Sequence, residues 1–257
     1  MTSHDNYISF LTIVRKEVTR WLRIWTQTLL PPVITQSLYF VIFGKFIGSK
    51  IGQIHGINYM DFIIPGLVMM AVINSAFANV VSSFFGAKFQ RSIEELLVSS
   101  MPNWVILAGY TIGGALRGIL VGIIVFMISV LFSWPQIQHP VVIAVFILLT
   151  SVVFSLGGFL NGVFAKKFDD VAIFPTFVLT PLTYLGGVFY SINSLPDLWQ
   201  KASLLNPILY MINGFRFGFY GISDVNVWLS MGILVFFTLV LTIANLYVLH
   251  QGTGLKT

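Results

Sequence analysis

Long apolar runs separated by short polar connections constrain this chain more than any other feature. Six runs can be read, at residues 28–48, 62–87, 104–131, 141–164, 172–190 and 227–249. A helix of about 20 apolar residues crosses the ~30 Å hydrocarbon core of a bilayer. Charged residues form only 9% of the chain, whereas soluble domains carry about 25%. The sequence therefore predicts an all-α integral membrane protein with six transmembrane helices.

The connections indicate one domain, residues 1–257, because no repeat relates the halves and no low-complexity linker divides them. The net charge of +5 does not predict a nucleic-acid partner, since the basic residues lie in short flanks between apolar runs. With the N-terminus inside, the inner set is Arg15, Lys16, Arg20, Arg23, Lys88, Arg91, Lys166, Lys167 and Lys256. The outer set is Lys45, Lys50, Lys201 and Arg216. This asymmetry predicts that both termini lie in the cytoplasm.

Residues 8–25 are amphipathic. On a helical wheel the apolar residues fall within one arc of about 120°, namely Phe10, Leu11, Val14, Val18, Trp21, Leu22 and Trp25. The opposite side carries Arg15, Lys16, Thr19, Arg20 and Arg23. Basic residues facing tryptophans are typical of a helix in the headgroup plane. We predict such an interfacial helix; the alternative is the charged start of the first span.

The segment KFQRSIEELLVSSMPN, residues 88–103, separates the second and third runs. Only nine residues of the chain are Asp or Glu, yet two of them stand side by side here. Good helix formers followed by a proline predict a short helix, which offers an amphipathic surface for a soluble partner. The alternative is a solvated loop. The residues concerned are Arg91, Ile93, Glu94, Glu95, Leu96, Leu97, Ser99 and Pro102.

Glycines recur every four residues in the third and fourth runs. They are Gly114, Gly118 and Gly122 in the third, preceded by Gly109 and Gly113, and Gly158 and Gly162 in the fourth. This spacing lets helix backbones approach closely. We expect packing within one subunit, with a dimer seam as the alternative.

Arg117 lies midway along the third run, where an arginine costs about 2.5–3.5 kcal/mol on insertion scales. One interpretation is a site for an anionic group of a cargo molecule. The other is a structural pairing with a neighbouring carboxylate or carbonyl, or a side chain that reaches the interface.

Residues 191–226 hold two apolar pieces, LPDLWQKASLL and ILYMINGFRFGFYG, on either side of Asn206 and Pro207. Each piece is too short to cross the membrane. A re-entrant helical hairpin on the outer side fits this pattern, because backbone at that depth must be shielded by protein or lie beside water. The alternative is a loop resting on the membrane surface.

Sequence patterns for catalysis or metal binding are missing. The four histidines are scattered, no Ser–His–Asp pattern is present, and GKF and GSK do not match the phosphate-binding G-x-x-x-x-G-K-[ST]. We therefore expect a protein that is not an enzyme and that binds no metal or cofactor itself.

Three stretches together resemble the permease subunits of bacterial ABC-2-type exporters, the group of polysaccharide, nodulation-factor and drug exporters. They are MDFIIPGLVM at 60–69, FQRSIEELLVSSMPNWVILAGYTIGG at 89–114, and LGGVFYSINSLPDLWQKASLLNPILYMINGFRFGFYG at 185–221. The last carries Leu-Pro, Asn-Pro and Arg-to-Gly steps, whereas Met101–Pro102 departs from the family's usual Pro-Leu step. The resemblance covers nearly the whole chain.

What the resemblance implies is a permease of the bacterial cytoplasmic (inner) membrane that works as a dimer with two ATPase subunits. ATP and Mg would act through that partner chain, and segment 91–102 would be its coupling helix. Cargo would be hydrophobic, lipid-linked or polysaccharide-type, and its pathway would include Arg117, Tyr210, Phe215, Arg216 and Phe219. The alternatives are a stand-alone carrier or channel driven by an ion gradient, which usually carries carboxylates inside its spans, and an enzyme acting on lipid-linked substrates.

Overall fold

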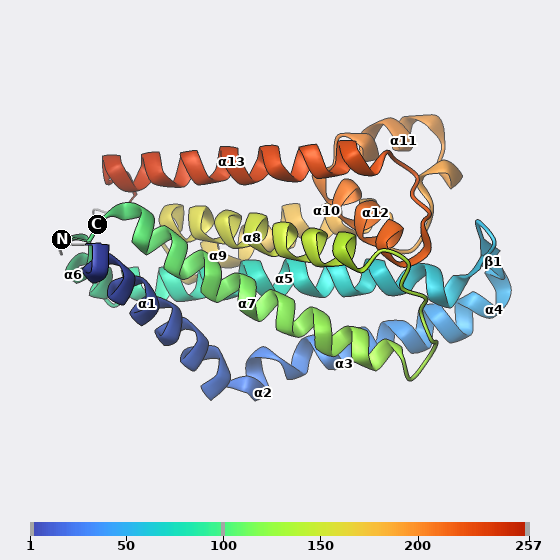
Figure 1. The fold of residues 1–257 in the computed structure, drawn as a ribbon, viewed down its shortest axis with the longest axis horizontal. Coiled ribbons are helices and arrows are strands. Elements are labelled where there is room, and N and C mark those ends of the chain that lie inside the picture. The colour runs from blue at the N-terminus through green and yellow to red at the C-terminus, as the bar shows by residue number, and fades with distance from the viewer. Residues whose placement is uncertain (1–2, 99–100, 255–257) are drawn as a thin grey trace.

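The structure is a computed structural model that describes residues 3–98 and 101–254, apart from the side chains of Ser3 and Leu97. It is an elongated helical bundle (Figure 1). Its long helices are α1 (Ser3–Arg23), α5 (Tyr59–Phe89), α7 (Asn103–Ser129), α8 (Pro140–Phe164) and α13 (Val227–Gln251). A bent series joins α1 to the rest: α2 (Trp25–Thr28), α3 (Leu30–Tyr39), a π-helix (Phe40–Ile47) and α4 (Gly48–Ile51).

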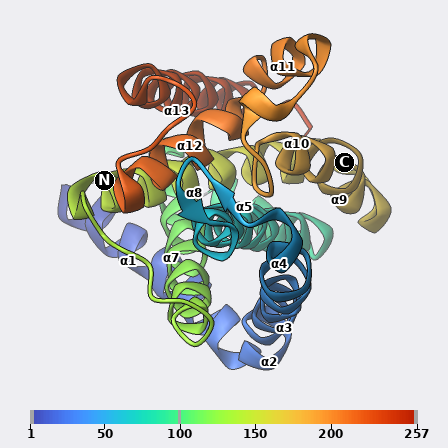
Figure 2. The same ribbon diagram turned by 90° about the vertical axis from the view of Figure 1, so that its right-hand side faces the viewer.

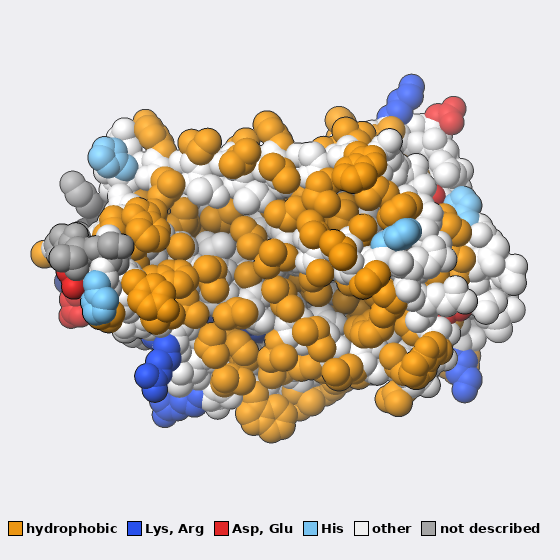
Figure 3. Space-filling view, in the orientation of Figure 1, with side chains coloured by type: hydrophobic (Ala, Val, Ile, Leu, Met, Phe, Trp, Pro, Cys, Tyr) orange, Lys and Arg blue, Asp and Glu red, His pale blue; other side chains and the backbone are white. Residues whose placement is uncertain are grey.

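Five stretches of the described chain are long and apolar enough to cross a membrane: Trp25–Ile51, Tyr59–Phe89, Asn103–Ser129, Pro140–Phe164 and Val227–Gln251. Each overlaps one of the predicted runs, so five of the six are confirmed as helices of spanning length. On the face seen in Figure 3, apolar side chains cover the middle and charged side chains gather toward the two ends. This distribution suits a bilayer core between two aqueous layers.

The predicted run 172–190 is a shorter helical stretch. It consists of α9 (Phe168–Phe174), a π-helical turn (Pro175–Leu179) and α10 (Thr180–Leu185), and it ends before Gly187, whose φ is +77°. Pro175 and Pro181 lack the N–H groups that a regular α-helix needs, and the π-helical turn begins at Pro175, where the first of these hydrogen bonds is missing. This stretch is not among the five stretches of spanning length in the described chain.

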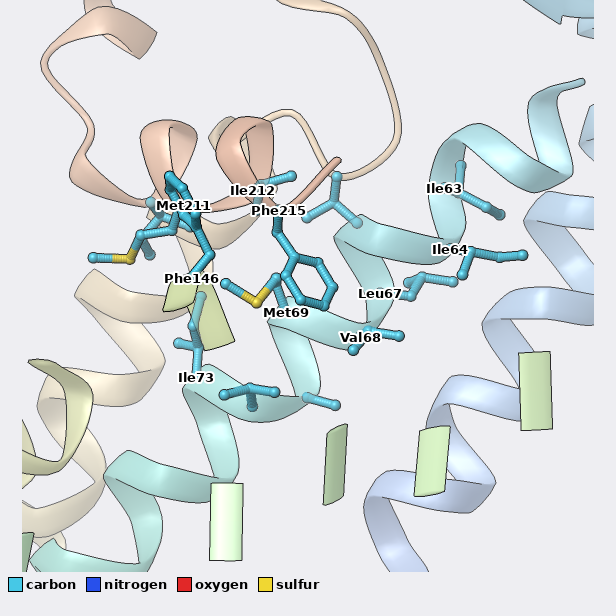
Figure 4. Close-up of a cluster of buried hydrophobic side chains, with 14 of the residues drawn as sticks. Ile63, Ile64, Leu67, Val68, Met69, Ile73, Phe146, Met211, Ile212 and Phe215 are labelled. Carbon is cyan, nitrogen blue, oxygen red and sulfur yellow. The ribbon is translucent and has the colours of Figure 1, made fainter. Parts of the chain in front are cut away.

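Helix α5 is the centre of the bundle. In its most apolar stretch 89% of the residues are buried, compared with 11% in α13. Its side chains meet α8 and α12 (Pro207–Tyr220) in the larger hydrophobic core, where Phe215 of α12 lies against Met69 of α5 (Figure 4). Pro65 is tolerated inside α5 because the neighbouring helices shield the backbone there.

Several short elements, among them α4, α11 and α12, lie at the end away from both termini, and Figure 2 looks onto this end. A small antiparallel hairpin pairs β1 (Gln53–Ile54) with β2 (Ile57–Asn58), in the register Gln53 to Asn58 and Ile54 to Ile57. A 3₁₀ turn (Ile192–Ser194), α11 (Asp197–Leu204) and α12 follow α10.

The Asn-Pro step starts α12. The Asn206 side chain accepts the Ile208 N–H at 3.0 Å, and Pro207 takes the first helical position, where its missing N–H costs nothing. Asn206 also donates to the carbonyl of Leu182 at 2.6 Å. Because α12 is almost wholly buried, these contacts fix two short helices within the depth of the bundle.

Candidate functional site: the α6 connection and the polar cluster beneath α1

Helix α6 (Ser92–Val98) joins α5 to α7. It lies at the same end of the molecule as both chain termini (Figure 1). The chain turns sharply before it, at Arg91, whose φ of +59° is in the left-handed region. After it, Pro102 precedes α7 in an extended conformation. The segment therefore begins at a sharp turn, and an extended Pro102 leads from it into α7.

The side chains of α6 divide into an inner and an outer set. Ile93 is 1% exposed and belongs to the second hydrophobic core, with Leu96 packed partly against it. Glu94 and Glu95 are exposed, as is Arg91, and Val98 is 87% exposed. The side chain of Leu97 and the whole of Ser99 lie outside the described residues. Helix α6 is thus held to the bundle by its apolar side and presents exposed carboxylates, a surface to which a soluble partner can bind.

A buried polar cluster lies beside this connection and was not predicted. Glu17 of α1 is fully buried, and its carboxylate accepts from Ser83 Oγ at 2.5 Å and from Arg20 Nη2 at 3.2 Å. Asn79 completes the cluster: its amide donates to Glu17 at 3.4 Å, and its side-chain oxygen accepts from Arg20 at 2.8 Å. An ion pair inside a bundle persists when each charge is also hydrogen-bonded, as here.

Helix α1 packs along α7. The side that faces the bundle is Ile13, Glu17 and Trp21, and a Cβ at Gly109 or Gly113 would come within 2.6 Å of Ile13 or 2.4 Å of Glu17. The two glycines therefore let α1 lie directly on the backbone of α7.

The predicted apolar side of residues 8–25 contains both buried and exposed side chains. Trp21 of the apolar arc is buried, but Leu11, Leu22 and Trp25 are 44%, 48% and 55% exposed. On the basic side, Arg15 and Arg23 are exposed, whereas Arg20 turns inward to Glu17. Exposed apolar side chains are also what a helix in the headgroup layer presents to lipid, so the interfacial helix stays a prediction.

Arg117 takes the structural pairing of the two interpretations. It is 8% exposed; its guanidinium donates to the carbonyl of Thr28 at 3.1 Å and to Asn79 Oδ1 at 3.5 Å. Asn79 thus joins Arg117 to the Glu17 cluster. The charge is engaged by protein groups in this structure, which favours the structural pairing, and the anion site for cargo stays a prediction.

The remaining predicted pathway residues are mostly part of the core. Phe215 and Phe219 are 1% and 2% exposed. Arg216 is 1% exposed, lies 3.8 Å from the centre of the Phe62 ring, and donates to the Gly187 carbonyl at 2.7 Å. Tyr210 is 8% exposed, lines a groove beside α13 and donates to the Leu204 carbonyl. In this conformation Phe215, Phe219 and Arg216 therefore lie in the core and Tyr210 at its edge, and their place in a cargo path stays a prediction.

The glycine stripes lie against α5. A Cβ at Gly158 would be 2.5 Å from the Phe77 carbonyl oxygen, and one at Gly118 would be 2.9 Å from Ala76. Gly114, Gly122 and Gly162 approach α5 in the same way, with nearest α5 atoms at 2.3, 2.6 and 3.3 Å. These positions hold α7 and α8 on the central helix of the same subunit.

Comparison with known proteins agrees with this architecture. The sequence matches the ABC-2 type transporter family over residues 8–220. The inner membrane transport permease YadH of Escherichia coli (strain K12) is 56% identical over 254 residues, covering 99% of each chain. Nodulation protein J of Rhizobium leguminosarum bv. viciae is 21% identical over 234 residues, 91% of this chain and 90% of its own. Nodulation protein J of Sinorhizobium fredii (strain NBRC 101917 / NGR234) is 27% identical over 184 residues, 70% of this chain and 68% of its own.

The described helices and these matches define a polytopic membrane transport protein. The chain belongs to the ABC-2 type transporter family.

Proposed function

We propose that this chain is the permease subunit of an ATP-driven exporter in the bacterial cytoplasmic membrane. It moves a hydrophobic, lipid-linked or polysaccharide-type substrate outward, as a homodimer with a separate ATPase that binds ATP and Mg. The observation that carries the proposal is α6: a short helix anchored by Ile93, with Glu94 and Glu95 free, at the end where both termini lie. The name of the Escherichia coli relative, a transport permease, supports it.

The topology proposed with this function has six spans. Residues 168–185 form the fifth, which at 1.5 Å per residue reaches about 27 Å and so needs a locally thinned bilayer. Helix α1 lies in the headgroup layer on the cytoplasmic side. Helices α11 and α12 enter the outer half and return; the burial of α12 supports this, because its backbone is shielded by protein.

The mechanism follows from the anchoring of α6. Closure of the ATPase dimer pushes on Glu94 and Glu95, and Ile93 carries the force into the core between α5 and α7. This mechanism couples the ATPase to the transport path, so ATP binding and cargo binding must shift the equilibrium between the same two conformations of the permease. Substitutions on the exposed surface of α6 should therefore change ATP hydrolysis by the partner, while the permease still inserts into the membrane normally.

The ion-gradient carrier is the second candidate because Glu17 is a fully buried carboxylate. Its carboxylate already accepts hydrogen bonds from Arg20, Ser83 and Asn79, which argues for a structural role. A carrier that exchanges protons would need a carboxylate that is free to change state.

The test is co-purification with a candidate ATPase subunit, followed by measurement of ATP hydrolysis in the presence of lipids and hydrophobic compounds. The double variant Glu94→Lys/Glu95→Lys should insert normally but lose the ATPase and its stimulation. The matched control is Asp197→Lys, an exposed acid of α11 at the opposite end. Normal stimulation in the double variant, or transport that stops with a protonophore and needs no ATPase, would remove the proposal.

A further inference from the structure

A cationic pocket and an apolar cavity meet at the terminus-side end of α8. The pocket, about 700 Å³, is lined by Lys88, Arg91 and Lys166, and no acidic residue contributes to its described lining. The cavity, about 450 Å³, lies between α8, the 168–185 stretch, α12 and α13. Phe164, the last residue of α8, lines both. A ligand could therefore place a charged group in one and an apolar chain in the other.

The apolar cavity has the length of one membrane leaflet. It follows α8 from Val153 to Phe164, about 16 Å at 1.5 Å per residue, and half of a ~30 Å hydrocarbon core is about 15 Å. One polar side chain, Asn161, lines it, and that side chain donates to the Val171 carbonyl at 3.3 Å. A wall is formed by Phe77 and Phe174, whose rings stack with centres 5.5 Å apart.

The cationic pocket has a buried charge at its base. Lys88 is 7% exposed, and its ammonium group donates to the carbonyls of Val163 at 2.7 Å and Ala165 at 2.9 Å, at the end of α8. An ammonium group has three donors, so one is left for a group in the pocket. Arg91 and Lys166 are exposed at the rim.

An acid lies beside the pocket but is engaged. The carboxylate of Asp170 accepts the backbone N–H groups of Lys166 at 2.8 Å and Lys167 at 3.0 Å. The carboxylate is thus held by the backbone, and the side chains of Lys88, Arg91 and Lys166 keep a net positive charge toward the pocket.

We infer that this site binds an anionic phospholipid of the leaflet on the terminus side, with its phosphate at Lys88, Arg91 and Lys166 and one acyl chain along α8. Basic pockets between membrane helices select anionic headgroups for this reason. A soluble anion would use the pocket but not the cavity, and a partner protein would not fill a slot that opens within the depth of the membrane. The inference rests on the proposed membrane topology and not on the exporter function.

The test titrates purified protein, without ATPase, with phosphatidylglycerol, phosphatidylcholine or inorganic phosphate, and counts retained molecules by native mass spectrometry. One phosphatidylglycerol should be retained in preference to phosphatidylcholine. Arg91→Gln/Lys166→Gln should weaken its retention about thirtyfold, which corresponds to ~2 kcal/mol for two cations. The control Lys167→Gln, whose side chain does not line the pocket, should have little effect.

A second variant tests the acyl-chain slot. Gly157 lines the cavity, and a Cβ there would meet nothing closer than 3.8 Å, so Gly157→Leu fills the slot without a clash of its Cβ. It should reduce phosphatidylglycerol retention at least tenfold. The control is Gly232→Leu on α13, where a Cβ meets nothing within 4 Å and the neighbouring groove is a different one.

Each other outcome contradicts the inference. Equal retention of both lipids means a groove without headgroup selection. Phosphate that competes fully, with no effect of Gly157→Leu, means a free-anion site. Lipid retention unchanged in every variant, together with loss of the ATPase from the cation variants, means a protein-docking surface. The two proposals can be refuted separately. The Glu94/Glu95 variant tests only the ATPase coupling, and it should retain phosphatidylglycerol as the wild type does.

Discussion

Two adjacent glycines of α8 give a sharp test of how closely α8 lies on α5. Gly158 faces the α5 backbone: a Cβ there would be 2.5 Å from the Phe77 carbonyl oxygen and 3.2 Å from the Phe77 carbonyl carbon. At Gly157 the nearest atoms are the ring carbons of the same Phe77, at 3.8 and 3.9 Å. The same substitution to alanine should therefore have opposite effects at the two positions.

The magnitude follows from these distances. Ordinary contact begins near 3.4 Å, so Gly158→Ala must push the two backbones apart by about 0.9 Å, and neither can turn away as a side chain would. Overpacking of this kind costs about 1–3 kcal/mol, and alanine recovers at most ~1 kcal/mol of helix propensity. We expect a net loss of ~1–2 kcal/mol for Gly158→Ala and a gain of at most ~1 kcal/mol for Gly157→Ala.

The assay is thermal unfolding in detergent, followed by size-exclusion chromatography of a fluorescent fusion, because the chain has no cysteine for thiol-reactive dyes. For a chain of this size, 1 kcal/mol corresponds to roughly 2–4 °C. Gly158→Ala should lower Tm by about 2–8 °C, and Gly157→Ala should leave it unchanged or raise it slightly. Equal Tm values for the two variants would refute the backbone contact between α8 and α5.

Three further predictions concern the polar contacts. Glu17→Gln should lower Tm by roughly 2–8 °C, since the buried pair with Arg20 is lost at ~1–2 kcal/mol; an unchanged Tm would mean that the cluster is not stabilising. Arg117→Lys and Arg117→Gln should both reduce Tm while transport per folded molecule stays normal, and a selective loss of anionic cargo would restore the cargo-site interpretation. Asn206→Ala should cost ~1–2 kcal/mol, because it removes both a helix cap and the contact with the Leu182 carbonyl; a Tm equal to wild type would contradict this.

Much of the fold could be predicted because it depends on composition and period. Run length located five helices to within a few residues of their ends, and four-residue glycine spacing predicted the close packing of α7 and α8, which the structure places against α5. The extent of the run 172–190 was harder to predict. Asp169 and Asp170 stand just before it and two prolines interrupt its helix, yet the run itself still reads as apolar.

The polar cluster could not be predicted in the same way. Glu17 stands on a stripe with Ile13 and Trp21, opposite Gly109 and Gly113, and that pairing of stripes was the available signal. It is visible only when two helices are known to touch. A helical wheel treats one helix alone and places its charged residues on the side away from the apolar arc. In the fold, Asn79 and Ser83 of α5 both donate hydrogen bonds to the carboxylate of Glu17.

The distribution of contacts favours a division of the bundle into a firm part and a loosely held part. Helix α1 is tied to α5 through Glu17 and to α7 through Gly109 and Gly113, and α6 is seated between α5 and α7 by Ile93. A force applied at α6 must therefore move α1, α5 and α7 together, because packed helices without voids do not deform gradually. Helix α13, 11% buried in its most apolar stretch, and the proline-interrupted stretch 168–185 have fewer such ties. In the proposed exporter, the rearrangement that opens a path would consequently fall between these two parts, which is where the apolar cavity lies.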